Sequence, residues 1–341
     1  MRTWVTGREL GGYCIGLFLL SLLPACRGKS AGAAQGAATA AASAASGARQ
    51  ASATPPLFRL AKLRAGLSTK ITAPTDRSPA VEPPAGVLEK VFYDAPLGKN
   101  VAYVSPVKPG AKRPAIVWIA GGMDWGIGSS AWDPQPHDND QSARAFREAG
   151  ISLMLPALRG SNESPGHNEC FLGEVDDILA AGAFLAKRAD VDPTRVYLGG
   201  HSTGGTLVLL AAESTDRFRA TFAFGPVADP RQYGDGGCLP ATVSDIEAVP
   251  RAPVDFLRDI RTPTFVIEGA RSGNAGVFPL LKKAKGAAPV ELRLIPDADH
   301  FTALASATEA LAAQILADTG SRSAIEVDVQ AIAERAAAKP N

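Results

Sequence analysis

One serine of this sequence lies in a pattern typical of nucleophiles. Gly200-His201-Ser202-Thr203-Gly204 satisfies G-x-S-x-G, with the apolar run "RVYLGG" before the serine and the helix-forming run "TLVLLAAES" after it. A sharp turn from strand to helix exposes a serine hydroxyl, and its flanking glycines let the two backbones approach closely. The spacing therefore predicts that Ser202 is the nucleophile of an acyl-transfer reaction.

Three other interpretations of the same stretch can be compared with this one. A phosphate loop needs G-x-x-x-x-G-K-[ST], but no lysine follows these glycines, and a dinucleotide fingerprint needs G-x-G-x-x-G. Neither pattern fits. A glycine-rich turn with an incidental serine remains as the third alternative, and the other reactive residues, which follow in the expected order along the chain, argue against it.

A serine hydroxyl is a poor nucleophile until a base accepts its proton. The sequence has four histidines, His137, His167, His201 and His300. His300 follows the last predicted strand in "VELRLIPDADHFTAL", downstream of Ser202, where a hydrolase base is expected, although a surface loop histidine is the alternative. His201 belongs to the turn itself, and we expect His137 and His167 to shape the pocket or to face solvent.

An acyl-transfer site also needs two backbone N–H groups that stabilise the developing negative charge. One should come from Thr203, directly after the serine. The other should come from Gly122 or Met123, in the "AGGM" loop that follows the strand "AIVWI". The alternative is that Gly121-Gly122 forms only a turn.

The elements around these residues alternate between strand and helix, without an internal repeat. "VLEKVFYDAPLGKNVAYVSP" predicts a β-hairpin around residues 96–100. Buried strands are predicted in "RPAIVWIAGG", "ISLMLPAL", "RVYLGG", "ATFAFGPV", "PTFVIEG" and "VELRLIP", and helices in "QSARAFREAG", "GEVDDILAAGAFLAKRA" and "TLVLLAAES". This order predicts an α/β fold with a mainly parallel central sheet covered by helices on both faces.

The N-terminal part of the chain has a different character. Arg2 and Arg8 precede a short apolar run that ends at Leu23-Pro24-Ala25-Cys26, which is the layout of an export signal with a lipobox-like end. Pro24 departs from the usual lipobox. The alternatives are an ordinary secretory signal and, because the run is short for a bilayer span, less favourably a retained membrane anchor.

These features divide the 341-residue chain into four parts. We expect a signal peptide with lipidation at Cys26 over 1–26, a flexible Ala/Gly/Ser-rich spacer over 27–56, a globular domain over 57–320 and a helical tail over 321–341. Lys and Arg total 35 and Asp and Glu 34, which argues against a nucleic-acid partner.

Two cysteines fall within the globular domain, Cys170 and Cys238. Disulfides persist in exported proteins, and both residues lie in loops expected at the carboxyl edge of the sheet. We therefore expect a possible disulfide between them, with two separate free thiols as the alternative.

Residues from about Leu57 to about Ala317 resemble an α/β-hydrolase domain of the prolyl-oligopeptidase-like (dienelactone-hydrolase-like) branch. The resemblance rests on the hairpin and first buried strand, on "PALRGSNESPG", on the stretch "GEVDDILAAGAFLAKRADVDPTRVYLGGHSTGG", on "FAFGPVADP" and on "DHF". It implies a serine hydrolase that cleaves peptide or ester bonds through an acyl-enzyme, and we expect neither a metal nor another cofactor.

The acid that orients His300 departs from the pattern of this family. The strand "PTFVI" is usually followed by H-G-x-x-D, but here Ser272 occupies the aspartate position. Glu268, at the end of the strand, is the first candidate for the acid and Asp229 the second. A serine–histidine dyad without an acid is the third possibility.

A second departure concerns the substrate. Prolyl oligopeptidases carry a large β-propeller that filters peptides, and the sequence between spacer and hydrolase domain is too short for one. We expect an open site for a small ester or a short peptide, which favours an esterase or acyl hydrolase. The opposing hypothesis is a non-catalytic envelope protein that binds a ligand with this fold, for which Ser272 is the supporting feature. The lipid anchor would attach either protein to a membrane of the cell envelope.

The Cys26→Ser substitution tests the predicted anchor. Because lipidation needs the thiol, we expect Cys26→Ser to move the protein from the membrane fraction to the soluble fraction of the cell. Fractionation followed by immunoblotting measures this shift. A Cys26→Ser protein that stays in the membrane with its apolar run uncleaved would contradict lipidation and favour the retained anchor.

Overall fold

The computed structural model of the chain describes residues 58–240 and 242–338. The expected signal peptide, its Cys26 and the spacer over 27–56 lie outside the described residues. Within these two ranges, no helix has both the length and the apolar character needed to cross a membrane.

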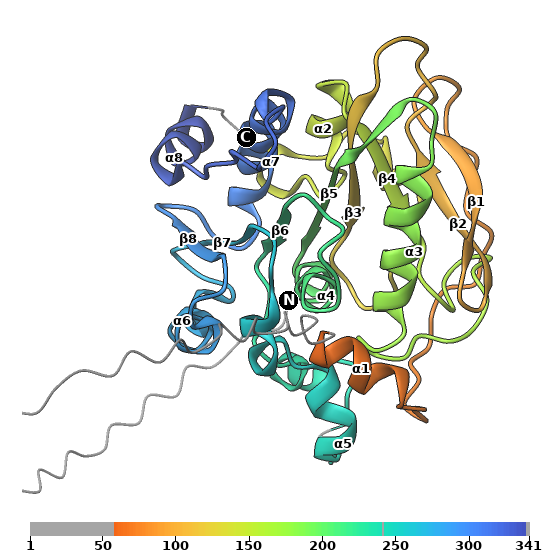
Figure 1. Cartoon of the computed structure of the whole chain (residues 1–341), viewed down its shortest axis with the longest axis vertical. Coiled ribbons are helices and arrows are strands. Elements are labelled where there is room, and N and C mark those ends of the chain that lie inside the picture. The colour runs from red at the N-terminus through yellow and green to blue at the C-terminus, as the bar shows by residue number, and fades with distance from the viewer. Residues whose placement is uncertain (1–57, 241, 339–341) are drawn as a thin grey trace, which may run out of the picture. The chain divides into compact units, whose positions relative to one another are not determined.

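A single sheet runs through the centre of the described chain (Figure 1). Its eight strands are β1 (Glu89–Ala95), β2 (Gly98–Val104), β3 (Arg113–Ile119), β4 (Ser152–Pro156), β5 (Val191–His201), β6 (Thr221–Phe224), β7 (Thr264–Gly269) and β8 (Val290–Ile295). They lie side by side in the order β1-β2-β4-β3-β5-β6-β7-β8. β2 is antiparallel to both β1 and β4, and all pairs from β4 to β8 are parallel. The predicted hairpin and the mainly parallel sheet are confirmed.

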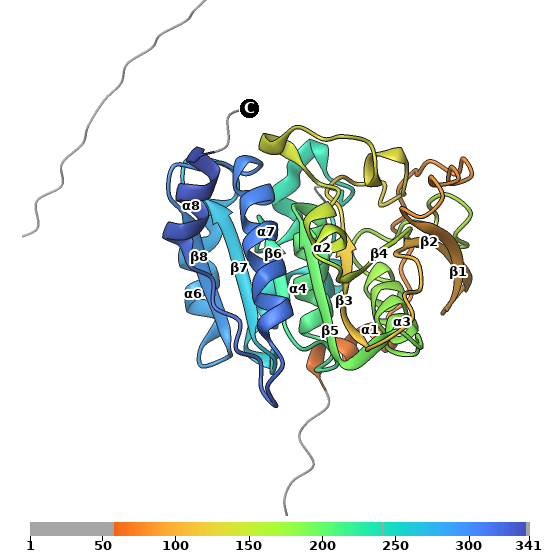
Figure 2. The same ribbon diagram turned by 90° about the horizontal axis from the view of Figure 1, so that it is seen from above.

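Helices cover both faces of this sheet, as its buried strands require. The helices are α1 (Arg59–Ala65), α2 (Arg144–Glu148), α3 (Glu174–Ala186), α4 (Thr203–Ala212), α5 (Asp245–Ala248), α6 (Phe278–Lys285), α7 (Thr302–Ala317) and α8 (Val329–Ala338). α3, α4 and α6 contribute Ile178, Leu207 and Leu281 to one hydrophobic core. α2, α7 and α8 contribute Phe146, Leu311 and Ile332 to a second core on the opposite face (Figures 1 and 2). The chain thus has the α/β-hydrolase fold.

The last helix is part of this packing. α8, in the segment expected as a helical tail, contacts α7 and β8, and its Ile332 is 1% exposed. The segment between β6 and β7 contains α5 and several short 3-10 turns, and it is joined to α1 by an ion pair between Arg59 and Asp259 (2.8 Å).

The parallel direction of β3, β5, β6, β7 and β8 brings their carboxyl ends to one edge of the sheet. Loops leave the sheet at that edge, and in doubly wound sheets such an edge is where ligand sites assemble. The residues singled out by the sequence follow these five strands, so the fold brings them to one place.

Candidate active site

Ser202 lies at the junction of β5 and α4, as the sequence predicts. Its φ of 57° and ψ of −116° belong to a region that L-residues rarely adopt. The Ser202 N–H donates to the carbonyl of Phe224 at the end of β6 (2.8 Å), and its carbonyl accepts from the N–H of Thr206 in α4 (3.0 Å). These two bonds hold the strained turn, which has the geometry of a nucleophile elbow.

The glycines of this turn are required by close backbone contacts. A Cβ atom at Gly204 would collide with the carbonyl oxygen of Ile119 at the end of β3, and one at Gly200 would lie 2.6 Å from the carbonyl oxygen of Gly204. α4 can therefore begin directly against β3 and β5 because these positions carry no side chain.

Glu268 and His300 form a hydrogen-bonded pair beside this turn. His300 Nδ1 lies 2.9 Å from Glu268 Oε2, and the Glu268 side chain is 1% exposed. The carboxylate also accepts the backbone N–H groups of Gly269 (2.8 Å) and Asn274 (2.9 Å), so its buried charge is compensated by three donors. Because a carboxylate only accepts, Nδ1 carries the proton and Nε2 is left as the basic nitrogen.

Two glycines with positive φ enclose this pair, Gly225 (54°) and Gly273 (86°). A Cβ atom at Gly225 would lie 2.6 Å from His300 Nδ1 and 2.9 Å from Glu268 Oε2, and one at Gly273 would lie 2.8 Å from the Cβ of His300. The Asn274 amide donates to the carbonyl of Gly225 (2.7 Å), which closes the enclosure. Any larger residue at either glycine would displace the pair.

Neither Ser272, at the family's aspartate position, nor Asp229, the second acid candidate, forms a hydrogen bond to His300 among the described residues. Ser272 is exposed. Asp229 accepts the backbone N–H of Arg231 (2.9 Å) and pairs with its guanidinium. Of the two candidate acids, Glu268 is the one that lies against the imidazole.

His201, the residue that precedes the serine, packs against His300. The ring centroids of His201 and His300 are 4.6 Å apart, but no hydrogen bond joins the Ser202 hydroxyl to His300 within the described part of the chain. Such bonds are often long in free enzymes and shorten with substrate. Burial, and then the charge of His300, lowers the pKa of His201 to about 4, so the His201 ring is neutral at pH 7.

The predicted oxyanion donors lie side by side. The Thr203 hydroxyl donates to the carbonyl of Gly122 and accepts from Trp125 Nε1 (3.2 Å), which ties the start of α4 to the glycine loop. In residues 58–240 and 242–338, the N–H groups of Gly122, Met123 and Thr203 have no protein acceptor. They are therefore available to an anionic oxygen.

Two asparagines of the loop after β4 hold the glycine loop, and the sequence analysis did not identify them. Asn168 Nδ2 donates to the carbonyl of Met123 (2.6 Å), and Asn162 Oδ1 accepts the N–H of Ile127 (2.8 Å). The family resemblance of the "PALRGSNESPG" stretch was the available signal for Asn162, but it assigned no contact to this residue, and Asn168 lies just beyond that stretch.

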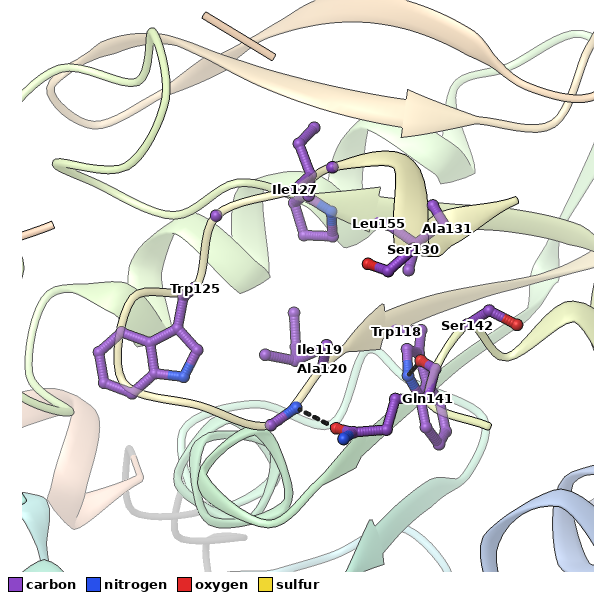
Figure 3. A pocket seen from close by; sticks show the side chains of 14 residues that line it. Trp118, Ile119, Ala120, Trp125, Ile127, Ser130, Ala131, Gln141, Ser142 and Leu155 are labelled. Atoms are coloured by element: carbon purple, nitrogen blue, oxygen red, sulfur yellow. Dashed lines mark hydrogen bonds between the residues drawn. The ribbon is translucent and has the colours of Figure 1, made fainter. Parts of the chain in front are cut away.

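A cavity of about 60 Å³ adjoins the glycine loop (Figure 3). Gln141 lines it and accepts the N–H of Gly121 through Oε1 (3.2 Å), which Figure 3 marks with a dashed line. Neither Ser202 nor His300 lines this cavity.

The two cysteines expected as a disulfide are free thiols in the structure. Their loops do meet, because Cys170 Sγ lies 3.1 Å from the carbonyl oxygen of Cys238. A side-chain hydrogen bond to Cys238, together with burial, raises the pKa of the Cys170 thiol.

The remaining histidines form no hydrogen bond to the pair among the described residues. His137 is 3.7 Å from Glu309, and His167 is exposed. Among the described residues, no group of three or more His, Cys, Asp or Glu side chains could hold a metal ion.

Comparison with known proteins places this geometry in a family. The model of the prolyl oligopeptidase family matches residues 140–317, about half of the chain, and this range includes Ser202, Glu268 and His300. The dual function macrocyclase-peptidase POPB of Galerina marginata is 30% identical over 120 residues, which cover 32% of this chain and 16% of that protein.

Solved structures of similar fold include peptidases and an esterase. A puromycin-hydrolyzing peptidase of Mycobacterium tuberculosis has a TM-score of 0.53 at 19% identity, covering 68% of this chain and 40% of the peptidase. The acylaminoacyl peptidase of Pyrococcus horikoshii has a TM-score of 0.54 at 16% identity, with 72% and 43% covered. An esterase of Pyrobaculum calidifontis has a TM-score of 0.52 at 16% identity, with 76% and 88% covered. The chain thus spans less than half of either peptidase.

The Glu268→Gln substitution tests the pair. A glutamine keeps the size of the side chain but removes the charge that stabilises the imidazolium, so we expect kcat to fall by about 10² to 10⁴-fold while KM changes by less than about 3-fold. Steady-state hydrolysis of a p-nitrophenyl ester measures both constants. Glu291→Gln, on an exposed position of β8, is the matched control. Wild-type kinetics for Glu268→Gln would show that Glu268 is not the acid that orients His300.

Proposed function

Because this chain belongs to the prolyl oligopeptidase family and is a serine hydrolase, we propose that it cleaves small esters or short peptides through an acyl-enzyme at Ser202. The single observation that supports this proposal most is the buried Glu268–His300 pair (2.9 Å) at the same sheet edge as the strained turn of Ser202. A buried acid–base pair of this kind is what an activated serine requires.

The proposed reaction begins with attack of Ser202 Oγ on the substrate carbonyl carbon. His300 Nε2 takes the hydroxyl proton, and Glu268 stabilises the imidazolium through Nδ1–H. The carbonyl oxygen becomes an oxyanion, which accepts hydrogen bonds from the N–H groups of Thr203 and of Gly122 or Met123. His300 then returns the proton to the leaving alcohol or amine as the bond to the acyl carbon breaks.

The second half of the reaction releases the acyl group. Water gives a proton to His300 Nε2 and attacks the acyl-enzyme, and the new oxyanion uses the same N–H groups. When the bond to Ser202 breaks, His300 returns the proton to the serine oxygen. The products are a carboxylic acid and the free enzyme.

A small substrate is part of the proposal. The described residues form one eight-stranded sheet with its helices and loops, and Gly122 in the glycine loop is exposed. The alignment with the Pyrobaculum esterase covers 88% of that enzyme, against 40% and 43% for the two peptidases. These observations favour an esterase or acyl hydrolase over a strict oligopeptidase.

Attachment to the cell envelope is a separate proposal. It rests on the charged start, apolar run and lipobox-like end at Cys26, followed by a spacer of small residues. The hydrolase domain would act close to a membrane surface while remaining outside the bilayer.

A binding protein without catalysis is the second candidate function. It is favoured by Ser272, which stands where this family has an aspartate, and by the missing hydrogen bond between Ser202 and His300 among the described residues. An activated serine reacts with a fluorophosphonate and an ordinary serine does not, so labelling separates the two functions.

The Ser202→Ala substitution tests the nucleophile. We expect wild type to be labelled stoichiometrically by a fluorophosphonate probe and Ser202→Ala not at all, with ester hydrolysis lowered by about 10⁴-fold or more. Ser272→Ala, a change at an exposed serine of a neighbouring loop, should label like wild type. If Ser202→Ala is labelled as strongly as wild type, the nucleophile is another residue. If wild type is not labelled, the binding protein is favoured.

A further inference from the structure

We propose that His201, the residue before the nucleophile, is a positioning residue that fixes the base His300 through a hydrogen bond from its Nε2–H to the His300 carbonyl. This inference rests on the proposed function, because it assigns His201 a task in bringing Ser202 and His300 together. The G-x-S-x-G pattern itself leaves the residue at this position open.

His201 is buried between the two halves of the candidate site. His201 is 1% exposed, and its Nε2 lies 3.0 Å from the carbonyl oxygen of His300. The ring also packs against the rings of His300 (4.6 Å between centroids) and Phe301 (5.5 Å). One side chain at the end of β5 thus contacts both the backbone and the ring of the base.

The proposed bond requires one particular tautomer of His201. A carbonyl oxygen only accepts, so Nε2 must carry a proton for the 3.0 Å contact to be a hydrogen bond. The ring is neutral because burial lowers its pKa to about 4, and a neutral imidazole has one N–H. The proposed bond therefore needs the Nε2–H tautomer, which leaves a lone pair on Nδ1.

The opposite side of the ring faces a second acceptor. His201 Nδ1 lies 3.1 Å from Gln141 Oε1, which also accepts the N–H of Gly121 (3.2 Å). Gln141 Nε2 donates to Asn139 Oδ1 (3.2 Å), which orients the amide oxygen toward His201. An amide oxygen accepts two hydrogen bonds, so in the Nδ1–H tautomer the ring proton would go to Gln141. The two tautomers therefore differ in whether His201 donates to His300 or to Gln141, and the measurements below distinguish them.

The effect of this bond on catalysis follows because His201 and Ser202 are consecutive residues. His201 and Ser202 are adjacent, so the bond from His201 to the His300 carbonyl links the strand that carries the nucleophile to the loop that carries the base. An error of about 1 Å in such a distance can cost about 100-fold in rate. Loss of the Nε2 donor should thus lower kcat, while substrate binding should change little.

Two substitutions separate this role from packing. In glutamine the terminal amide nitrogen is four bonds from Cα, as Nε2 is in histidine, whereas in asparagine it is three bonds away, as Nδ1 is. We expect His201→Gln to keep kcat within about 5-fold of wild type and His201→Asn to lower it by about 100-fold, with similar KM for both. Ester hydrolysis and thermal unfolding are measured for both variants. Equal losses of kcat in both variants would overturn the proposal.

The tautomer of His201 can also be measured on the wild-type protein, which avoids any folding defect of a variant. Nitrogen-15 NMR of the wild-type chain labelled at its four histidines distinguishes the two neutral tautomers. We expect one buried ring with a protonated Nε2 that titrates well below pH 6, and its signal should be absent in His201→Gln. A protonated Nδ1 with a bare Nε2 would overturn the proposal. If the fluorophosphonate probe does not label wild type, the proposed function is refuted instead. The NMR measurement would still identify the tautomer of His201, because it does not depend on activity.

Discussion

The candidate site depends on one buried hydrogen bond, from His300 Nδ1 to the carboxylate of Glu268 (2.9 Å). His300 leaves the sheet after β8, but its ring must act above β5, three strands away in the sheet order, with β6 and β7 between them. The loop reaches that far because it lies directly on the end of β7, where a Cβ atom at Gly269 would collide with the backbone of Asp299. Glu268, one residue earlier on β7, holds the ring in that position.

The candidate acid of this chain lies at a different position from the acid of the resembled family. The resembled family places an aspartate in the loop after this strand, whereas this chain has Ser272 there and Glu268 inside the strand. The extra methylene of glutamate lets a carboxylate reach the imidazole from the strand itself. The loop then contributes Asn274, whose N–H donates to Glu268 and whose amide donates to the carbonyl of Gly225.

Local patterns in the sequence predicted the elements and the turn well. Apolar runs bounded by glycines indicated the strands, and G-x-S-x-G indicated the strained residue at φ 57°. The choice between Glu268 and Asp229 stayed open, since Glu268 ends one strand and Asp229 follows another at the same edge, and the sequence pattern does not show that Asp229 pairs with Arg231. Asn162, Asn168 and Gln141 were missed because amides in irregular loops follow no period. The sequence analysis expected Cys170 and Cys238 to lie close together, which they do, but both are free thiols in the structure.

The central claim is that Ser202, His300 and Glu268 work as one unit, and a crystal structure of the chain after reaction with a fluorophosphonate tests it most directly. We expect phosphorus on Ser202 Oγ, a phosphoryl oxygen within about 3 Å of the Thr203 N–H and of the Gly122 or Met123 N–H, and His300 Nε2 facing the adduct with Nδ1 still on Glu268. Phosphorus on another residue, or an adduct at Ser202 with the His300 ring turned away and Glu268 unpaired, would contradict the account.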